Sequence, residues 1–184
     1  MFRSRQTFRL RIGRVSLPGA TYFVTMCAAR RQPVFASPDH ARIATEALAN
    51  LADANEVSWL AGTVMPDHLH VLFQLGDRLP LARVMAKLKG AITRRINHDL
   101  GSHLWQENAF EHRLRPDESA EAYAFYIFMN PYRAALCGNE ATWPWWVCTD
   151  PARFQFLTLR RANRSPQPEW LDEAERISNQ IVRR

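Results

Sequence analysis

Apolar and polar residues alternate along several short stretches of the chain, and a period of two is typical of half-buried β-strands. These stretches are rich in β-branched and aromatic residues, with proline, glycine and polar residues between them. The pattern predicts four strands, at residues 20–28, 57–64, 68–75 and 104–114. Pro66 has no amide hydrogen to donate, so it belongs to the connection between the second and third strands.

Apolar residues recur every three or four positions in other stretches, as on the buried face of an amphipathic α-helix. This spacing predicts helices over residues 38–56, 79–100 and 169–182. A fourth helix is predicted to begin at Asp117 and to end at Pro131, because proline lacks a backbone donor and disfavours helix in the residue before it.

The predicted elements follow the order strand, helix, two strands, helix, strand, helix, which is that of a split βαβ arrangement. We therefore expect an α+β fold, a ferredoxin-like sandwich in which helices cover one face of a central antiparallel sheet. The strand at 68–75 would be central, and the helix at 117–131 would lie across the open edge of the sheet. Around a domain at 17–150 we expect a basic N-terminal arm, 1–16, and a C-terminal tail with a short helix, 151–184.

Two histidines stand two positions apart in the predicted central strand. Because side chains of a strand alternate between faces, His68 and His70 share one face of the sheet. The apolar residues between and after them point to the opposite face. Two neutral imidazoles on one face form half of a site for a divalent metal ion, whereas surface histidines of a half-buried strand are the alternative.

Tyr126 and Asn130 are four positions apart in the predicted fourth helix, so they lie one turn apart on one face. The amide oxygen of Asn130 can be a third metal ligand beside the two imidazoles. The Tyr126 hydroxyl would then lie within reach of a group that the metal polarises, as nucleophilic attack on a phosphodiester requires. Tyr123, one turn earlier, is the alternative nucleophile.

Three motifs follow one another in this chain. They are the His68-Leu69-His70 strand, the segment Trp105-Gln106-x-x-x-Phe110-Glu111-His112-x-Leu114-Arg115 and the helix Tyr126-x-x-x-Asn130-Pro131. In this order and at this spacing they resemble the single-tyrosine HUH transposases of the IS200 type, and most of all the REP-associated branch. The resemblance covers about residues 17–150, which we therefore designate an HUH tyrosine transposase domain.

The resemblance implies a metal-dependent endonuclease and strand transferase for single-stranded DNA, with the HUH motif on the central strand. Tyr126 would attack the DNA and form a 5′-phosphotyrosine, and His68, His70 and Asn130 would hold Mg²⁺ or Mn²⁺. The substrate would be a hairpin of a repeated extragenic palindrome, and the protein would act as a monomer or a homodimer. Relatives often carry Asn in place of Asp67, and we assign that residue no role.

The formal charge of +6 and the isoelectric point of about 9.8 favour polyanionic partners. Arginine is frequent in the first 38 residues, which contain no acidic residue, so this arm is suited to contacts with DNA phosphates; a solvated basic terminus is the alternative. His112 either supports the metal site from outside its ligands or is a surface histidine. The basic residues that we predict to contact DNA are Arg9, Arg11, Arg14, Lys87, Arg94 and Arg113.

Cys27, Cys137 and Cys148 show no CxxC spacing, and no apolar run approaches the roughly 20 residues that a membrane span needs. We therefore expect a cytoplasmic, nucleoid-associated protein that does not bind membranes.

Two other functions fit parts of the pattern. One is a domesticated, noncatalytic protein that only binds DNA hairpins, although here the nucleophile and the ligands are all present. The other is a nucleotide hydrolase of the histidine-triad kind, which would need a third histidine at position 72, where this chain has Leu72.

Overall fold

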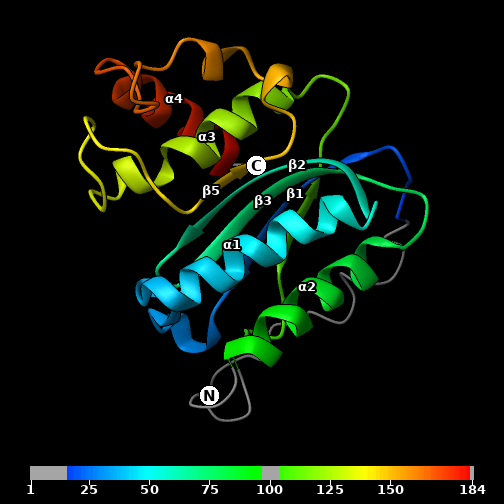
Figure 1. The fold of residues 1–184 in the computed structure, drawn as a ribbon. Coiled ribbons are helices and arrows are strands. Elements are labelled where there is room, and N and C mark those ends of the chain that lie inside the picture. The colour runs from blue at the N-terminus through cyan, green and yellow to red at the C-terminus, as the bar shows by residue number, and fades with distance from the viewer. Residues whose placement is uncertain (1–15, 97–103, 183–184) are drawn as a thin grey trace, which may run out of the picture.

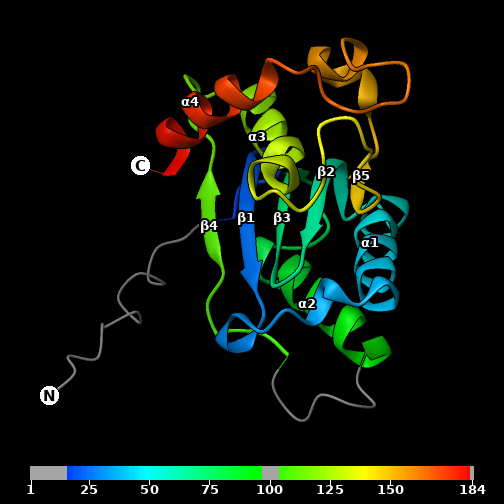
Figure 2. The ribbon, with the colours of Figure 1, turned by 90° about the vertical axis from the view of Figure 1, so that its left-hand side faces the viewer.

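The computed structural model describes residues 16–96 and 104–182, which form an antiparallel sheet of five strands with helices on both faces (Figure 1). The strands lie in the order β4-β1-β3-β2-β5, so β3 is central, as the sequence predicts (Figure 2). Their bounds are Thr21–Cys27 for β1, Val57–Met65 for β2, His68–Leu75 for β3, Phe110–Arg113 for β4 and Trp146–Cys148 for β5.

The helices are divided between the two faces of the sheet (Figure 1). On one face lie α1 (Pro38–Asp53) and α2 (Leu81–Ile96), and on the other lie α3 (Ala120–Arg133) and α4 (Trp170–Val182). The α+β class is confirmed, but helices cover both faces instead of the one that we expected. Short 3₁₀ segments lie at Ala29–Arg31, Val34–Ala36, Pro151–Arg153 and Gln155–Thr158.

Both faces of the sheet carry large apolar side chains, and each therefore needs a helical cover. Leu69, Val71 and Phe73 of β3 pack in one core with α1 and α2. Leu72 of β3 and Phe23 of β1 point to the opposite face and pack in a second core with α3. A central strand with apolar residues on both faces is typical of a sheet that is buried between two layers.

The helix α3 lies over the face of β2 and β3, whereas we expected it across the open edge of the sheet. It begins after Ser119, whose hydroxyl accepts a hydrogen bond from the Ala122 amide at 3.3 Å. It also continues through Pro131 to Arg133, two residues beyond the predicted end. Pro131 cannot donate a hydrogen bond to the carbonyl of Ile127, so the last turn of α3 lacks one backbone bond, and the helix ends two residues later.

The predicted strand at 104–114 is much shorter than expected, because only Phe110–Arg113 forms β4. Trp105 makes a single bridge to Ala28, and its indole nitrogen donates to the Thr93 hydroxyl at 3.0 Å. This anchoring to α2 replaces continuous pairing with β1. The end of α2 predicted at residue 100 lies outside the described residues.

The segment after β5 packs onto α3 and completes the second core. Trp170 at the start of α4 is 7% exposed and contacts the rings of Phe125, Phe128 and Phe156 at centroid distances of 5.3, 6.3 and 6.1 Å. In the described part of the chain, none of the helices combines the length and apolar character that crossing a membrane requires.

Candidate active site

His68 and His70 face each other on the side of the sheet that α3 covers. Their Nε2 atoms are 3.0 Å apart, and both side chains are largely buried. The period of two along β3 produces this pair, as the sequence predicts. Two imidazole nitrogens at this distance repel unless a proton or a cation lies between them.

The outer nitrogen of each imidazole binds a neighbouring side chain. Nδ1 of His68 lies 2.6 Å from Oδ1 of Asp67, and Nδ1 of His70 lies 2.8 Å from the hydroxyl of Thr25. An ionised carboxylate only accepts, so His68 carries its proton on Nδ1 and directs the lone pair of Nε2 toward His70. Thr25 reaches His70 because β1 pairs with β3 in a register that sets the two residues opposite each other.

Burial keeps both imidazoles neutral. It lowers the pKa of His68 below the usual value, although the Asp67 carboxylate acts in the opposite direction. The pKa of His70 is well below its usual range because of burial, with added repulsion from His68 and from the cations Arg31 and Arg133. A neutral imidazole has the lone pair that metal coordination needs.

Tyr126 of α3 packs against His70, one member of this pair. Its ring centroid is 5.6 Å from that of His70, and Phe23 stacks on His70 at 5.6 Å and meets Tyr126 edge-on at 6.0 Å. The guanidinium of Arg133 lies 5.7 Å from the centre of the Tyr126 ring. One chain thus brings the histidines, the tyrosine and a cation together.

Asn130 lies one turn further along α3 and is buried. Its amide nitrogen donates to the backbone carbonyl of Tyr126 at 3.1 Å, which leaves the amide oxygen as the atom that could bind an ion. This bond follows from the predicted spacing of four residues.

Comparison with known proteins identifies the family of the chain. The family model "Transposase IS200 like" matches residues 16–127, well over half of the chain. The chain belongs to the IS200-like transposase family. A Haemophilus influenzae protein named "Putative REP-associated tyrosine transposase" is 27% identical in an alignment of 94 residues, and the match covers 45% of this chain and 53% of that protein. The chain thus matches about half the length of that relative.

A solved structure of a REP-associated tyrosine transposase bound to a REP hairpin also matches. It is 20% identical, with a TM-score of 0.59 over 79% of this chain and 82% of that one. At this identity the match shows a shared fold, and it confirms the α+β architecture expected of an IS200-like transposase.

In this IS200-like transposase, His112 and Tyr123 form a cluster beside the histidine pair. Their rings stack at 5.8 Å, and both bind the carboxylate of Glu118: Nε2 of His112 at 2.8 Å and the Tyr123 hydroxyl at 3.1 Å. The Tyr123 hydroxyl therefore has a partner already, whereas Tyr126 is the tyrosine whose ring packs on His70.

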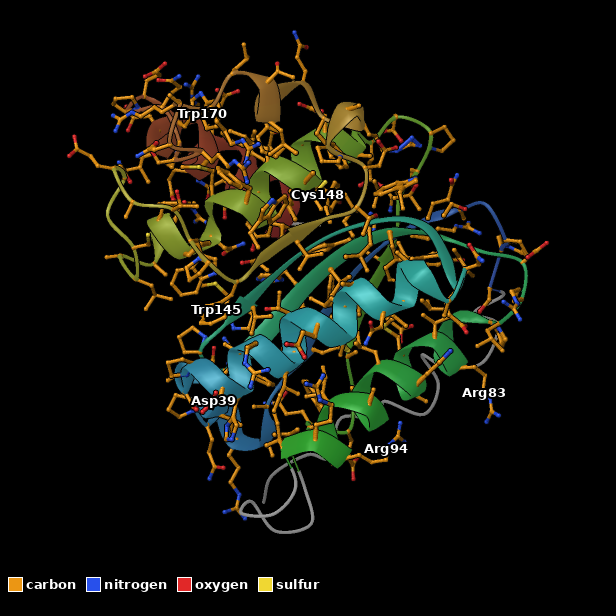
Figure 3. All side chains as sticks on the ribbon, viewed as in Figure 1. Asp39, Arg83, Arg94, Trp145, Cys148 and Trp170 are labelled. Carbon is orange, nitrogen blue, oxygen red and sulfur yellow. The ribbon has the colours of Figure 1, made fainter. Side chains whose placement is uncertain are left out.

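Within the described residues, the basic residues predicted to contact DNA do not gather at the site. Lys87 and Arg94 are on α2, on the opposite face of the sheet, where Lys87 binds Glu56 and Arg94 lies on the outer side of the helix (Figure 3). Arg113 is exposed on the edge strand β4. Arg9, Arg11 and Arg14 lie outside the described residues.

Sequence reasoning missed several residues that shape the site, namely Phe23, Thr25, Arg31, Asp67 and Arg133. The position of Asp67 directly before His68 was a usable signal for one of them. The contacts of Thr25 and Phe23 depend on the register between β1 and β3, which no local pattern reveals.

Proposed function

We propose that the protein is a metal-dependent strand transferase that cleaves single-stranded hairpin DNA with Tyr126 as the nucleophile. The observation that carries the proposal is the contact of the Tyr126 ring with His70, which itself faces His68, within one chain. Family membership and the REP hairpin in the structural relative support the same substrate class.

The donor atoms fit a divalent cation. Two ligand atoms about 2.1 Å from one octahedral ion lie about 3.0 Å apart when they are adjacent, and the two Nε2 atoms have this separation. His68, His70 and the amide oxygen of Asn130 would hold Mg²⁺ or Mn²⁺. These neutral ligands leave the ion its full charge, and when bound it would act as a Lewis acid for a phosphate oxygen.

The residues of the chain provide the rest of the reaction. The Tyr126 oxygen attacks the phosphorus, a Tyr–O–P bond forms and the P–O3′ bond breaks; the phenol gives up one proton and the leaving 3′ oxygen takes up one, which leaves a free 3′-OH. The Arg133 guanidinium, which lies against the Tyr126 ring and is bound to Glu175, helps to hold that ring in place. A later 3′-OH can attack the same phosphorus, release Tyr126 and rejoin the strand.

A Tyr126→Phe variant tests this function. It retains the ring that packs on His70, so stability and hairpin binding should be unchanged, whereas the covalent adduct should disappear because no attacking oxygen remains. Labelled hairpin oligonucleotides with Mg²⁺, resolved on a denaturing gel, measure the adduct. Tyr123→Phe is the matched control and should keep forming it.

The outcomes separate the rival functions. A wild-type protein that binds hairpins but never forms an adduct would be the noncatalytic binder. An adduct that persists in Tyr126→Phe and is lost in Tyr123→Phe would move the nucleophile one turn back along α3.

A further inference from the structure

A chain of contacts leads from the surface to the histidine pair through Arg31 and Asp67. Nε of Arg31 lies 2.8 Å from Oδ2 of Asp67, and Oδ1 of the same carboxylate lies 2.6 Å from Nδ1 of His68. The two oxygens of Asp67 therefore serve two different partners. A carboxylate held at one oxygen cannot rotate freely, so its other oxygen has a fixed direction toward the imidazole.

The backbone places Arg31 for this contact at a cost. Arg30 and Arg31 both have positive φ, at 54° and 57°, a conformation that side chains with a Cβ adopt rarely. Such strain persists only where surrounding contacts impose it. Here the Arg31 guanidinium also donates to Sγ of Cys27 at 2.9 Å, and Cys27 is the β1 residue that pairs with His68.

The backbone of the Asp67 turn is fixed as well. The carbonyl of Asp67 accepts from the Ala28 amide at 2.9 Å, so the turn before His68 is bonded to the strand end that precedes Arg30 and Arg31. The Asp67 side chain is mostly buried, with 23% of its surface exposed. The backbone bond to Ala28 and the side-chain contacts with Arg31 and His68 therefore both restrict the position of Asp67.

We propose that Arg31 and Asp67 are positioning residues that hold the His68 imidazole with its proton on Nδ1 and its Nε2 lone pair directed at the metal position. This proposal rests on the proposed function, because orienting His68 matters for the reaction only if His68 is a ligand of the proposed metal site. It assigns Asp67 a role that the sequence did not suggest.

The first test observes the imidazole itself in the metal-free protein. Nitrogen-15 NMR of the histidine rings distinguishes a proton on Nδ1 from one on Nε2. Wild-type His68 should show the Nδ1–H tautomer, Asp67→Ala should shift the population toward Nε2–H, and Asp67→Asn should retain the wild-type form because its amide oxygen can still accept. Asp39→Ala, which removes a surface carboxylate of α1, is the control and should change nothing.

The second test uses the two strained arginines as a matched pair. Glycine relieves the positive φ at either position, which offsets the larger backbone entropy that glycine loses on folding, so Arg30→Gly and Arg31→Gly should both remain folded in denaturant titrations. Only Arg31→Gly should weaken Mn²⁺ binding, by less than the roughly 10–100-fold that is typical of losing the direct partner of a metal ligand, because Arg31 acts through Asp67 and its own charge repels a cation. Titration calorimetry with Mn²⁺ alone measures this.

The readouts separate this proposal from the proposed function. Equal Mn²⁺ affinity in Arg31→Gly and Arg30→Gly, or an unchanged His68 tautomer in Asp67→Ala, would overturn the positioning role. A wild-type protein that binds no Mn²⁺ would remove the metal site, while the tautomer comparison would still decide whether Asp67 orients His68.

Discussion

At the residue scale, Glu118 joins the edge strand β4 to the start of α3 through its contacts with His112 and Tyr123. Its side chain is 3% exposed, and its carboxylate accepts hydrogen bonds from His112, the Arg115 amide and the Tyr123 hydroxyl. Burial opposes ionisation, but these bonds prevail and lower the pKa of Glu118 to about 2 from the usual 4.5. Folding therefore favours the ionised carboxylate.

The sign of this pKa shift fixes a pH window for stability. A carboxyl with a lowered pKa in the folded state stabilises the protein above its usual pKa of 4.5, and the stabilisation is lost as the pH falls toward about 2. The free energy of unfolding of wild type should thus exceed that of Glu118→Gln at pH 6, and the difference should shrink between pH 4.5 and 2. Urea denaturation across this range measures it, and a difference independent of pH would contradict the assignment.

The sequence predicts those site residues whose contacts depend on residues near them in the chain. The shared face of His68 and His70 follows from the period of a strand, and the closeness of Tyr126 and Asn130 follows from the period of a helix. Both periods depend only on neighbouring residues, so the sequence was sufficient to predict these two pairs. Thr25 was missed because its contact with His70 depends on pairing between strands 45 residues apart.

At the element scale, the hairpin of β2 and β3 holds His70 in place through close backbone contact. A Cβ added at Gly62 of β2 would lie 3.2 Å from the His70 carbonyl oxygen and 3.3 Å from Cδ1 of Leu48 on α1. Both are tighter than ordinary contact, and the carbonyl belongs to the central strand, which cannot move easily. Gly62 therefore sets how closely α1 and β2 approach β3.

A Gly62→Ala variant should therefore be destabilised, by about 1–3 kcal/mol, through overpacking. Gly138→Ala is the matched control, since an added Cβ there meets no atom within 4 Å among the described residues, and it should be neutral or stabilised by up to about 1 kcal/mol. Chemical denaturation compares the two. Equal stabilities would show that the sheet relaxes around the extra methyl group.

Element boundaries were predicted well where local pattern and packing agree. The bounds of β3 match the sequence prediction, because its residues are buried on both faces and its ends are marked by Pro66 and Gly76. The predicted strand from residue 104 failed because Trp105 binds α2, a tertiary contact that outweighs the alternating pattern.

At the scale of the whole molecule, the C-terminal segment supports α3, the helix that carries Tyr126. Trp170 packs against Phe125 and Phe128 on α3, and Arg133 binds Glu175 of α4 at 2.9 and 3.0 Å. The sequence predicted the terminal helix but gave no sign of this docking, since the partners are about 45 residues apart and no local period links them.

Replacing Trp170 should therefore affect both stability and cleavage. Trp170→Ala should lower the free energy of unfolding by about 3–5 kcal/mol through loss of buried area and the cavity left behind. Adduct formation at temperatures below unfolding should also slow, because α3 loses part of its support. Leu159→Ala, at a position that is 55% exposed, is the control and should change neither. Full cleavage by folded Trp170→Ala would show that the packing of α4 on α3 is not needed for cleavage.

Tyr126 contacts His70 of its own chain, and this contact predicts the activity of a mixture of two inactive variants. An equimolar mixture of Tyr126→Phe and His70→Ala chains should remain inactive, because every chain then lacks part of its own site. If helices were exchanged between subunits, hybrid dimers would regain one intact site and the mixture would recover cleavage. For the same reason, adduct yield per chain with saturating labelled hairpin should not fall on dilution, as expected if a single molecule carries out the proposed cleavage alone.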